Sequence, residues 1–178
     1  MISEQKVTAF ISHRCDEYHG SLNELRKAFE FYLQNYSIDP KYGCRPLEDD
    51  RSCNLPGRMK KAMSESQIFI AFISDSWGNS SNLKWPEKEW KIWNETWKQN
   101  EAVSLNVIGY CLGNKICQHR NIGEIHQFLI DIDRSSGSPS IVARDKAVIN
   151  DMSQTIRDAV DRARNYLNRG KEQIGINP

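Results

Sequence analysis

The segment QIFIAFIS, residues 67–74, decides how this chain is built. Six of its eight residues are apolar, and β-branched and aromatic side chains dominate it. A short, continuous apolar run of this kind is typical of a strand that is buried on both faces, as in the middle of a parallel sheet. The polar segment DSWGNSSN (75–82) follows at once and predicts a loop. We therefore expect residues 67–74 to form a central strand.

Upstream of this strand, the run VTAFIS (7–12) predicts a second buried strand that ends in a polar loop. Residues 21–34 predict a helix, because apolar side chains recur at spacings of three and four after a capping box made by Ser21 and Glu24. Residues 56–66 predict another, shorter helix that starts at a proline. The first half of the chain thus alternates strands with helices.

The remaining expected elements are a short strand near residues 44–47 in the turn-rich segment 35–58, a helix within 83–99, a strand at 104–112, a helix or strand at 125–132, a strand at 140–145, and a helix at 149–170. The order favours an α/β fold, a flavodoxin-like three-layer sandwich with a central, mainly parallel five-stranded sheet. We expect one domain over residues 1–170, with Gly170 ending the last helix, and a short flexible tail at 171–178.

The composition is that of an ordinary globular protein, with 39% hydrophobic and 26% charged residues in 178. The formal net charge is only +1, so the chain carries no signal for capturing nucleic acid or an anionic membrane. No apolar run is long enough to span a bilayer, and the start of the sequence does not resemble a secretory signal. We expect a cytoplasmic protein.

The five cysteines predict neither a disulfide framework nor a metal site, since their number is odd and no C-x-x-C pair occurs. Cys111, Cys117 and His119 lie close together, but their spacing matches no compact pair of zinc ligands. The sequence identifies no partner for His119 or His126. We expect no bound metal.

The predicted topology indicates where a ligand would bind. In a flavodoxin-like sheet, ligands lie beyond the carboxyl ends of the strands where the winding direction reverses, between the first and third strands. These strands are residues 7–12 and 67–74, and the tryptophan-rich helix begins just after the second of them. The first two turns of that helix should therefore face the crevice, including Trp85 and Glu89.

On a helix, Trp85 and Glu89 are four residues apart and share a face. Trp90, Trp93 and Trp97 form a separate stripe, which we interpret as core or interface aromatics. Acidic residues are favoured at a helix N-terminus by the helix dipole, and this explains Glu87 without any chemical role.

Three segments, in order, resemble the conserved boxes of Toll/interleukin-1 receptor (TIR) domains. They are VTAFISH (7–13), LEDDRSCNLPGRMKKAMSESQIFIAFISDSW (47–77) and KWPEKEW (84–90), and the resemblance covers residues 5–168. The third segment is similar to the family's W-x-x-x-E motif, in which the glutamate is the catalytic residue of NAD-cleaving members. Pro86 replaces a cysteine that often follows the tryptophan. The family's BB loop joins its second strand to its second helix, and here it carries RSCNLPG in place of a tighter turn.

Carried over residue by residue, the resemblance implies roles at one site. Glu89 would be the catalytic acid and Trp85 the aromatic wall. Phe10, Ser12 and Arg14 would flank the nucleotide, and Asp49, with Asp50, would lie where the second strand meets the BB loop. NAD+ would be the substrate and not a cofactor. No G-x-G-x-x-G follows the first strand, so no dehydrogenase is implied.

The implied enzyme is an NAD+ nucleosidase, a hydrolase or cyclase that releases nicotinamide and ADP-ribose or a cyclic ADP-ribose isomer in immune or defence signalling. Expected partners are other TIR domains, by self-association, and a separate sensor or effector protein. A non-enzymatic TIR adaptor is the alternative. A receiver-like phosphoacceptor domain is a further alternative, suggested by Asp49, Asp50 and the flavodoxin-like pattern. It is disfavoured, because the acid pair it needs straight after the first strand and a suitable later lysine are missing, although Asp75 lies near the phosphoacceptor position.

Overall fold

The computed structural model describes residues 6–12, 21–42, 55–73, 84–112, 125–135 and 137–173. Six strands in this part of the chain form one sheet in the order β2-β1-β3-β4-β5-β6. The strands are β1 (Val7–Ser12), β2 (Ile38–Tyr42), β3 (Ile68–Ile73), β4 (Val107–Cys111), β5 (His126–Asp133) and β6 (Ser140–Ala143). The helices are α1 (Ser21–Gln34), α2 (Leu55–Ser64), α3 (Lys84–Trp97), α4 (Glu101–Ser104) and α5 (Ile149–Gln173), with a 3-10 turn at Lys146–Val148.

The predicted α/β class and the mainly parallel sheet are confirmed. β1 to β5 pair in parallel, and β3 is central, between β1 and β4. In place of the expected five strands, the described residues contain six, because β6 joins the edge of β5 in antiparallel register. The order β2-β1-β3-β4-β5 is compatible with a flavodoxin-like arrangement, and it reverses between β1 and β3.

β2 corrects the sequence prediction. The strand expected near residues 44–47 lies outside the described residues, whereas Ile38–Tyr42, assigned above to a turn-rich segment, pairs with β1. Pro40 concealed this strand, because proline lacks the N–H that a ladder needs and is tolerated mainly at a sheet edge. β2 occupies such an edge. Ser37, with a φ of 57°, makes the tight turn from α1 into β2.

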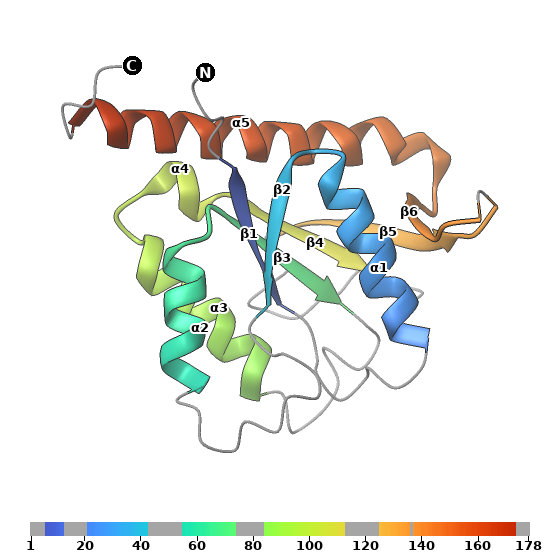
Figure 1. Cartoon of the computed structure of the whole chain (residues 1–178), viewed down its shortest axis with the longest axis horizontal. Coiled ribbons are helices and arrows are strands. Elements are labelled where there is room, and N and C mark those ends of the chain that lie inside the picture. The colour runs from blue at the N-terminus through green and yellow to red at the C-terminus, as the bar shows by residue number, and fades with distance from the viewer. Residues whose placement is uncertain are drawn as a thin grey trace.

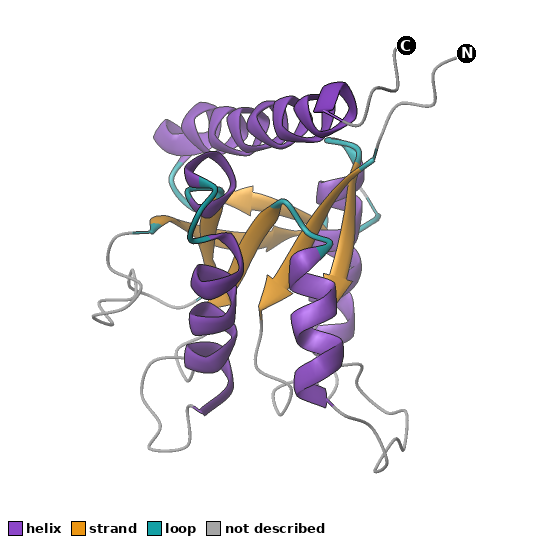
Figure 2. Cartoon of the chain, turned by 90° about the vertical axis from the view of Figure 1, so that its left-hand side faces the viewer, coloured by secondary structure: helices purple, strands orange, loops and turns teal. Residues whose placement is uncertain are grey.

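Helices cover both faces of the sheet, as Figures 1 and 2 show. Alternation along β1 divides its side chains between them: Val7, Ala9 and Ile11 join a core with α1 and α5, and Phe10 joins a second core with α2 and α3. The alternation of side chains along the strands therefore gives the sheet two apolar faces, and each face is covered by a layer of helices.

The tryptophan stripe of α3 is a packing surface, as its spacing predicts. Trp93 is fully buried and Trp97 nearly so. The Trp93 ring lies 5.4 Å from that of Phe69 and 6.0 Å from that of Trp97, measured between centroids. Trp90 is half-buried at the margin of this core. α3 is thus fixed to the sheet mainly by aromatic contacts.

α5 lies along the side of the sheet from which the strands start, and β1 points away from it (Figure 1). Apolar residues recur along α5 at helical spacing: Met152, Ile156, Val160 and Ala163 are buried against the sheet, and Leu167 packs partly buried against the same core. The expected stop at Gly170 is wrong: α5 continues to Gln173. A glycine within a helix costs only about 1 kcal/mol relative to alanine, so it need not end the helix. None of the helices in the described ranges combines the length and apolar character needed to cross a membrane.

We expect the fold to lose stability at alkaline pH, because two of its tyrosines are buried. Tyr110 donates a hydrogen bond to the Tyr32 hydroxyl (3.4 Å), and burial raises the pKa of both. Above about pH 10 an unfolded chain releases protons that the folded chain keeps, so the free energy of unfolding falls by up to about 1.4 kcal/mol per pH unit for each tyrosine. Urea titrations between about pH 8 and 11 measure this slope. Tyr32→Phe should make it shallower, and an unchanged slope would contradict the assignment.

Candidate functional site

A buried serine and a buried glutamate meet at the carboxyl end of β1. Ser12, the last residue of that strand, is fully buried, and Glu89 of α3 is only 3% exposed. The Ser12 hydroxyl donates a hydrogen bond to Glu89 Oε2 across 77 residues of sequence. Glutamates are almost never this buried unless they are paired, because removing a carboxylate from water is costly. The contact therefore marks a specific polar site at the edge of the apolar core.

The fold brings these two residues together for local reasons. Ser12 lies two residues after Phe10, so both side chains face the layer made by α2 and α3. β3 pairs with β1, with Ser12 opposite Ala71, and α3 packs on the same layer. Glu89 lies in the second turn of α3, which places it level with the end of β1. The site thus lies where the strand order reverses.

Glu89 belongs to the buried line of α3. The spacing above assigned Glu89 to a face with Trp85, apart from the tryptophan stripe. In the structure Glu89, Trp93 and Trp97, four residues apart each, are all buried. The separation into two faces is therefore wrong for Glu89. A carboxylate continues an aromatic stripe because Ser12 provides a partner at that level of the core.

Of the other expected site residues, Phe10 is the one whose side chain lies within the described part of the chain. Phe10 is fully buried, and its ring stacks on Phe69 at 5.9 Å and 24°, so it belongs to the core on the face of β1 that also carries Ser12. Trp85 lies in the first turn of α3, and its side chain is outside the described residues. Arg14 and Asp49 also lie outside them. Of the expected set, the described residues bring together Ser12, Phe10 and Glu89.

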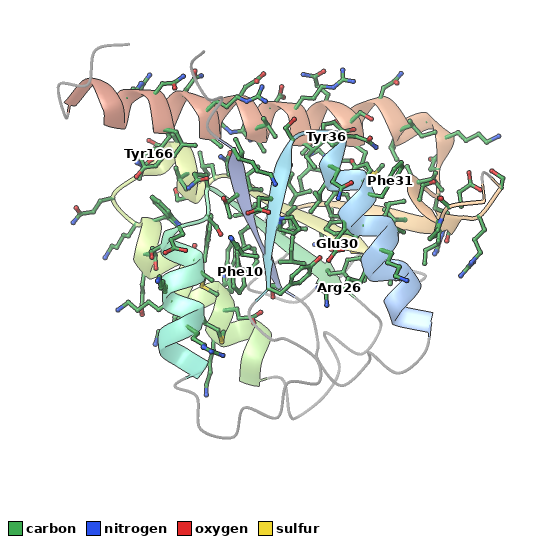
Figure 3. All side chains as sticks on the ribbon, viewed as in Figure 1. Phe10, Arg26, Glu30, Phe31, Tyr36 and Tyr166 are labelled. Atoms are coloured by element: carbon green, nitrogen blue, oxygen red, sulfur yellow. The ribbon has the colours of Figure 1, made fainter. Side chains whose placement is uncertain are left out.

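A charged cluster that the sequence patterns did not single out lies near the carboxyl ends of β1 and β2. Tyr42 ends β2, and its neighbour across the ladder is Ile11. Glu30 accepts hydrogen bonds from Arg26 Nε at 2.8 Å and from the Tyr42 hydroxyl at 3.0 Å. The hydrogen bond to Glu30 is the main reason that the pKa of Arg26 is raised. Figure 3 shows Arg26 and Glu30 along α1. The Arg26–Glu30 spacing of four residues was the available signal.

In the described part of the chain, no group of three or more histidine, cysteine or acidic side chains is placed to hold a metal ion. A scan against protein-family models gave no match, and a search of curated proteins gave no significant match. Function is therefore inferred from the chain's own residues, and among those described the buried Ser12–Glu89 pair is the contact that carries most information.

Proposed function

We propose that this chain is a TIR-domain NAD+ nucleosidase that cleaves the bond between nicotinamide and ribose. The observation that carries the proposal is the buried carboxylate of Glu89, held by Ser12 at the carboxyl end of β1. Two further points support it: ligands of doubly wound sheets bind at this edge, where the strand order reverses, and the three TIR-like segments occur in order along the chain.

The chemistry asks little more of the protein than a well-placed negative charge. When the bond breaks, its electron pair goes to the pyridinium nitrogen, so nicotinamide leaves as a neutral molecule. The ribose becomes an oxocarbenium-like cation, which a nearby carboxylate stabilises. Attack by water at the same carbon, with loss of a proton, gives ADP-ribose. Attack by a nitrogen of the adenine, in place of water, gives a cyclic ADP-ribose isomer.

Within this mechanism, Glu89 is the residue that faces the developing charge, and Ser12 is a positioning residue. The serine hydroxyl occupies one carboxylate oxygen and fixes the side-chain orientation. Trp85 would stack on a planar ring of the substrate, Arg14 would bind phosphate, and Phe10 and Asp49 would complete the walls. Self-association with other TIR domains, a separate sensor or effector and a cytoplasmic location belong to the same proposal.

Product analysis tests the proposal directly. The purified chain, at low and at high concentration, is incubated with NAD+ and the mixture is resolved by mass spectrometry. We expect release of nicotinamide together with either ADP-ribose or a cyclic ADP-ribose isomer, which is lighter than ADP-ribose by one water. High protein concentration is included because self-association is part of the proposal. An absence of nicotinamide above the buffer control at every concentration would count against an enzyme.

The same contact also favours a second candidate, a non-enzymatic adaptor that acts through TIR–TIR association. Glu89 is almost completely buried and bonded within the fold, as expected of an acid that joins α3 to β1 for stability alone. The two candidates differ in one measurable respect. In an adaptor, substitutions at Glu89 that preserve the fold leave association between copies unchanged, and NAD+ stays intact with the unaltered protein.

A further inference from the structure

A second polar site lies at the other end of the sheet, near the starts of β4 and β5. A pocket of about 500 Å³ opens there between these strand ends, α3, α4 and α5. This volume lies within the roughly 300–1,000 Å³ of pockets that hold small molecules. Its walls include Trp90, Asn94, Leu105, His126, Asp158 and Arg162. Ser12 and Glu89 do not line it, so the pocket and the proposed NAD+ site are separate.

Arg162 is an anchored cation in this pocket. Its Nε donates to Asn106 Oδ1 at 2.6 Å, across 56 residues of sequence. Asn106 is itself fixed, because it is fully buried and its Nδ2 donates to the carbonyl oxygens of Gln67 and Ala159, at 3.1 and 3.2 Å. No carboxylate among the described residues lies within ion-pair distance of Arg162. The two terminal nitrogens of the guanidinium therefore form a pre-oriented fork of the kind that binds phosphate or carboxylate.

Two rings in the wall of the pocket are also held in place. Trp90 lies edge-on to Phe69, with ring centroids 5.6 Å apart and planes at 70°. His126, for which the sequence identified no partner, has two: its Nε2 lies 3.2 Å from Asp151 Oδ2, and its ring stacks on Phe128 at 4.5 Å. A fixed aromatic ring that is only half-buried is suited to stacking on a planar ligand.

The pocket also contains a hydrogen-bond acceptor near the cation. Asp158 precedes Arg162 by one turn of α5, so both lie on the same face of the helix. One oxygen of Asp158 accepts from Gln154 Nε2 at 2.7 Å, which leaves its second oxygen for a ligand hydroxyl or amine. Carboxylates commonly accept hydrogen bonds from ribose hydroxyls in nucleotide sites. An anion-binding fork, a planar wall and an acceptor thus surround one cavity.

We propose that this pocket binds a small nucleotide of the size of a nucleoside monophosphate. The phosphate binds the guanidinium of Arg162, the base packs against Trp90, and a ribose hydroxyl donates to Asp158. A bare phosphate leaves the aromatic wall and the acceptor unused, and an uncharged nucleoside leaves the Arg162 fork empty. Because it shares no residue with the Ser12–Glu89 pair, the proposal stands independently of the NAD+ chemistry.

Calorimetric titration of the full chain tests this proposal with three probes: adenosine monophosphate, adenosine and inorganic phosphate. We expect the monophosphate to bind at least about tenfold more tightly than either fragment, since each fragment loses one charged or stacked contact. Arg162→Gln should weaken binding of the monophosphate by at least about tenfold, which is the worth of a charge-assisted hydrogen bond. Arg157→Gln is the matched control, because Arg157 is exposed on the same helix and does not line the pocket.

Two further variants separate this site from the one at Glu89. Glu89→Gln should leave the affinity for the monophosphate unchanged, and Trp90→Leu should weaken it while circular dichroism confirms the fold. The proposal is overturned if Arg162→Gln binds as tightly as the unaltered chain. It is equally overturned if the monophosphate gives no heat at millimolar concentration, or if binding is lost in Glu89→Gln but kept in Arg162→Gln. The last result would assign the nucleotide to the opposite end of the sheet.

Discussion

Replacing Glu89 with glutamine is expected to lower nicotinamide release from NAD+ by at least about 100-fold, the usual scale for removing one charge-stabilising or proton-handling group. Glutamine keeps the volume of the side chain, and its carbonyl oxygen can still accept the hydrogen bond from Ser12. The variant therefore removes the negative charge and little else. Initial rates of nicotinamide release at saturating NAD+ measure the effect.

Glu95→Gln provides the matched control in the same helix. Glu95 is exposed, and its ion-pair contact is with Lys91 Nζ at 3.9 Å. Its charge is therefore screened by solvent, and removing it should not affect the rate of nicotinamide release. Thermal unfolding of both variants is measured in parallel. If Glu89→Gln retains the full rate of nicotinamide release, the catalytic role of Glu89 is refuted. If it retains its thermal stability as well, the adaptor's structural explanation for the acid is also weakened.

Replacing Trp93 with alanine is expected to lower the free energy of unfolding by about 3–5 kcal/mol, the range for deleting a large buried aromatic side chain. Trp93 is 0% exposed and contacts the rings of both Phe69 and Trp97, so its removal leaves a cavity between α3 and β3. Since whole domains are stable by only about 5–15 kcal/mol, a loss of this size approaches the limit for folding. Urea denaturation followed by circular dichroism measures it.

Phe31→Ala is the control for Trp93→Ala, because Phe31 is an aromatic residue that is 50% exposed on α1. Its cost should stay within about 0.5 kcal/mol, as for other surface substitutions. Trp93→Phe should cost less than Trp93→Ala, since the Trp93 indole N–H has no hydrogen-bond partner among the described residues and phenylalanine removes it without breaking a bond. If Trp93→Ala and Phe31→Ala lowered the free energy of unfolding equally, the claim that Trp93 stabilises the packing of α3 on β3 would be contradicted.

The elements that were predicted correctly from the sequence are those whose apolar residues form a continuous run or recur at helical spacing without interruption. β1 and β3 are continuous apolar runs that fill two cores, and α5 repeats its apolar residues at helical spacing. β2 failed this test, because Pro40 and charged neighbours hide a strand that is stabilised by its pairing with β1 and not by its own composition. An edge strand is stabilised by pairing with its neighbour in the sheet, and the local sequence pattern carries no information about that neighbour.

The candidate site divides in the same way. Topology and motif spacing together led to Glu89, but grouping it with Trp85 apart from the tryptophan stripe was wrong, since Glu89 is also four residues from Trp93 and shares its face. Only the distant partner Ser12 explains why a carboxylate continues that stripe. The pocket around Arg162 gave no sequence signal at all, because the residue that anchors the arginine, Asn106, lies 56 positions away, between α4 and β4.

The edge formed by β2 limits how copies of this chain can meet. Pro40 offers no N–H to an incoming strand, and Asp39 lies between two lysine ammonium groups, with Lys6 Nζ at 3.4 Å and Lys41 Nζ at 3.3 Å. Proline and charge on an exposed edge discourage the growth of one sheet into another. Assembly by fusing sheets across this edge is therefore disfavoured, and any ordered polymer of the chain should be joined through other surfaces. A polymer joined through side chains on those surfaces can come apart again without breaking backbone hydrogen bonds between sheets.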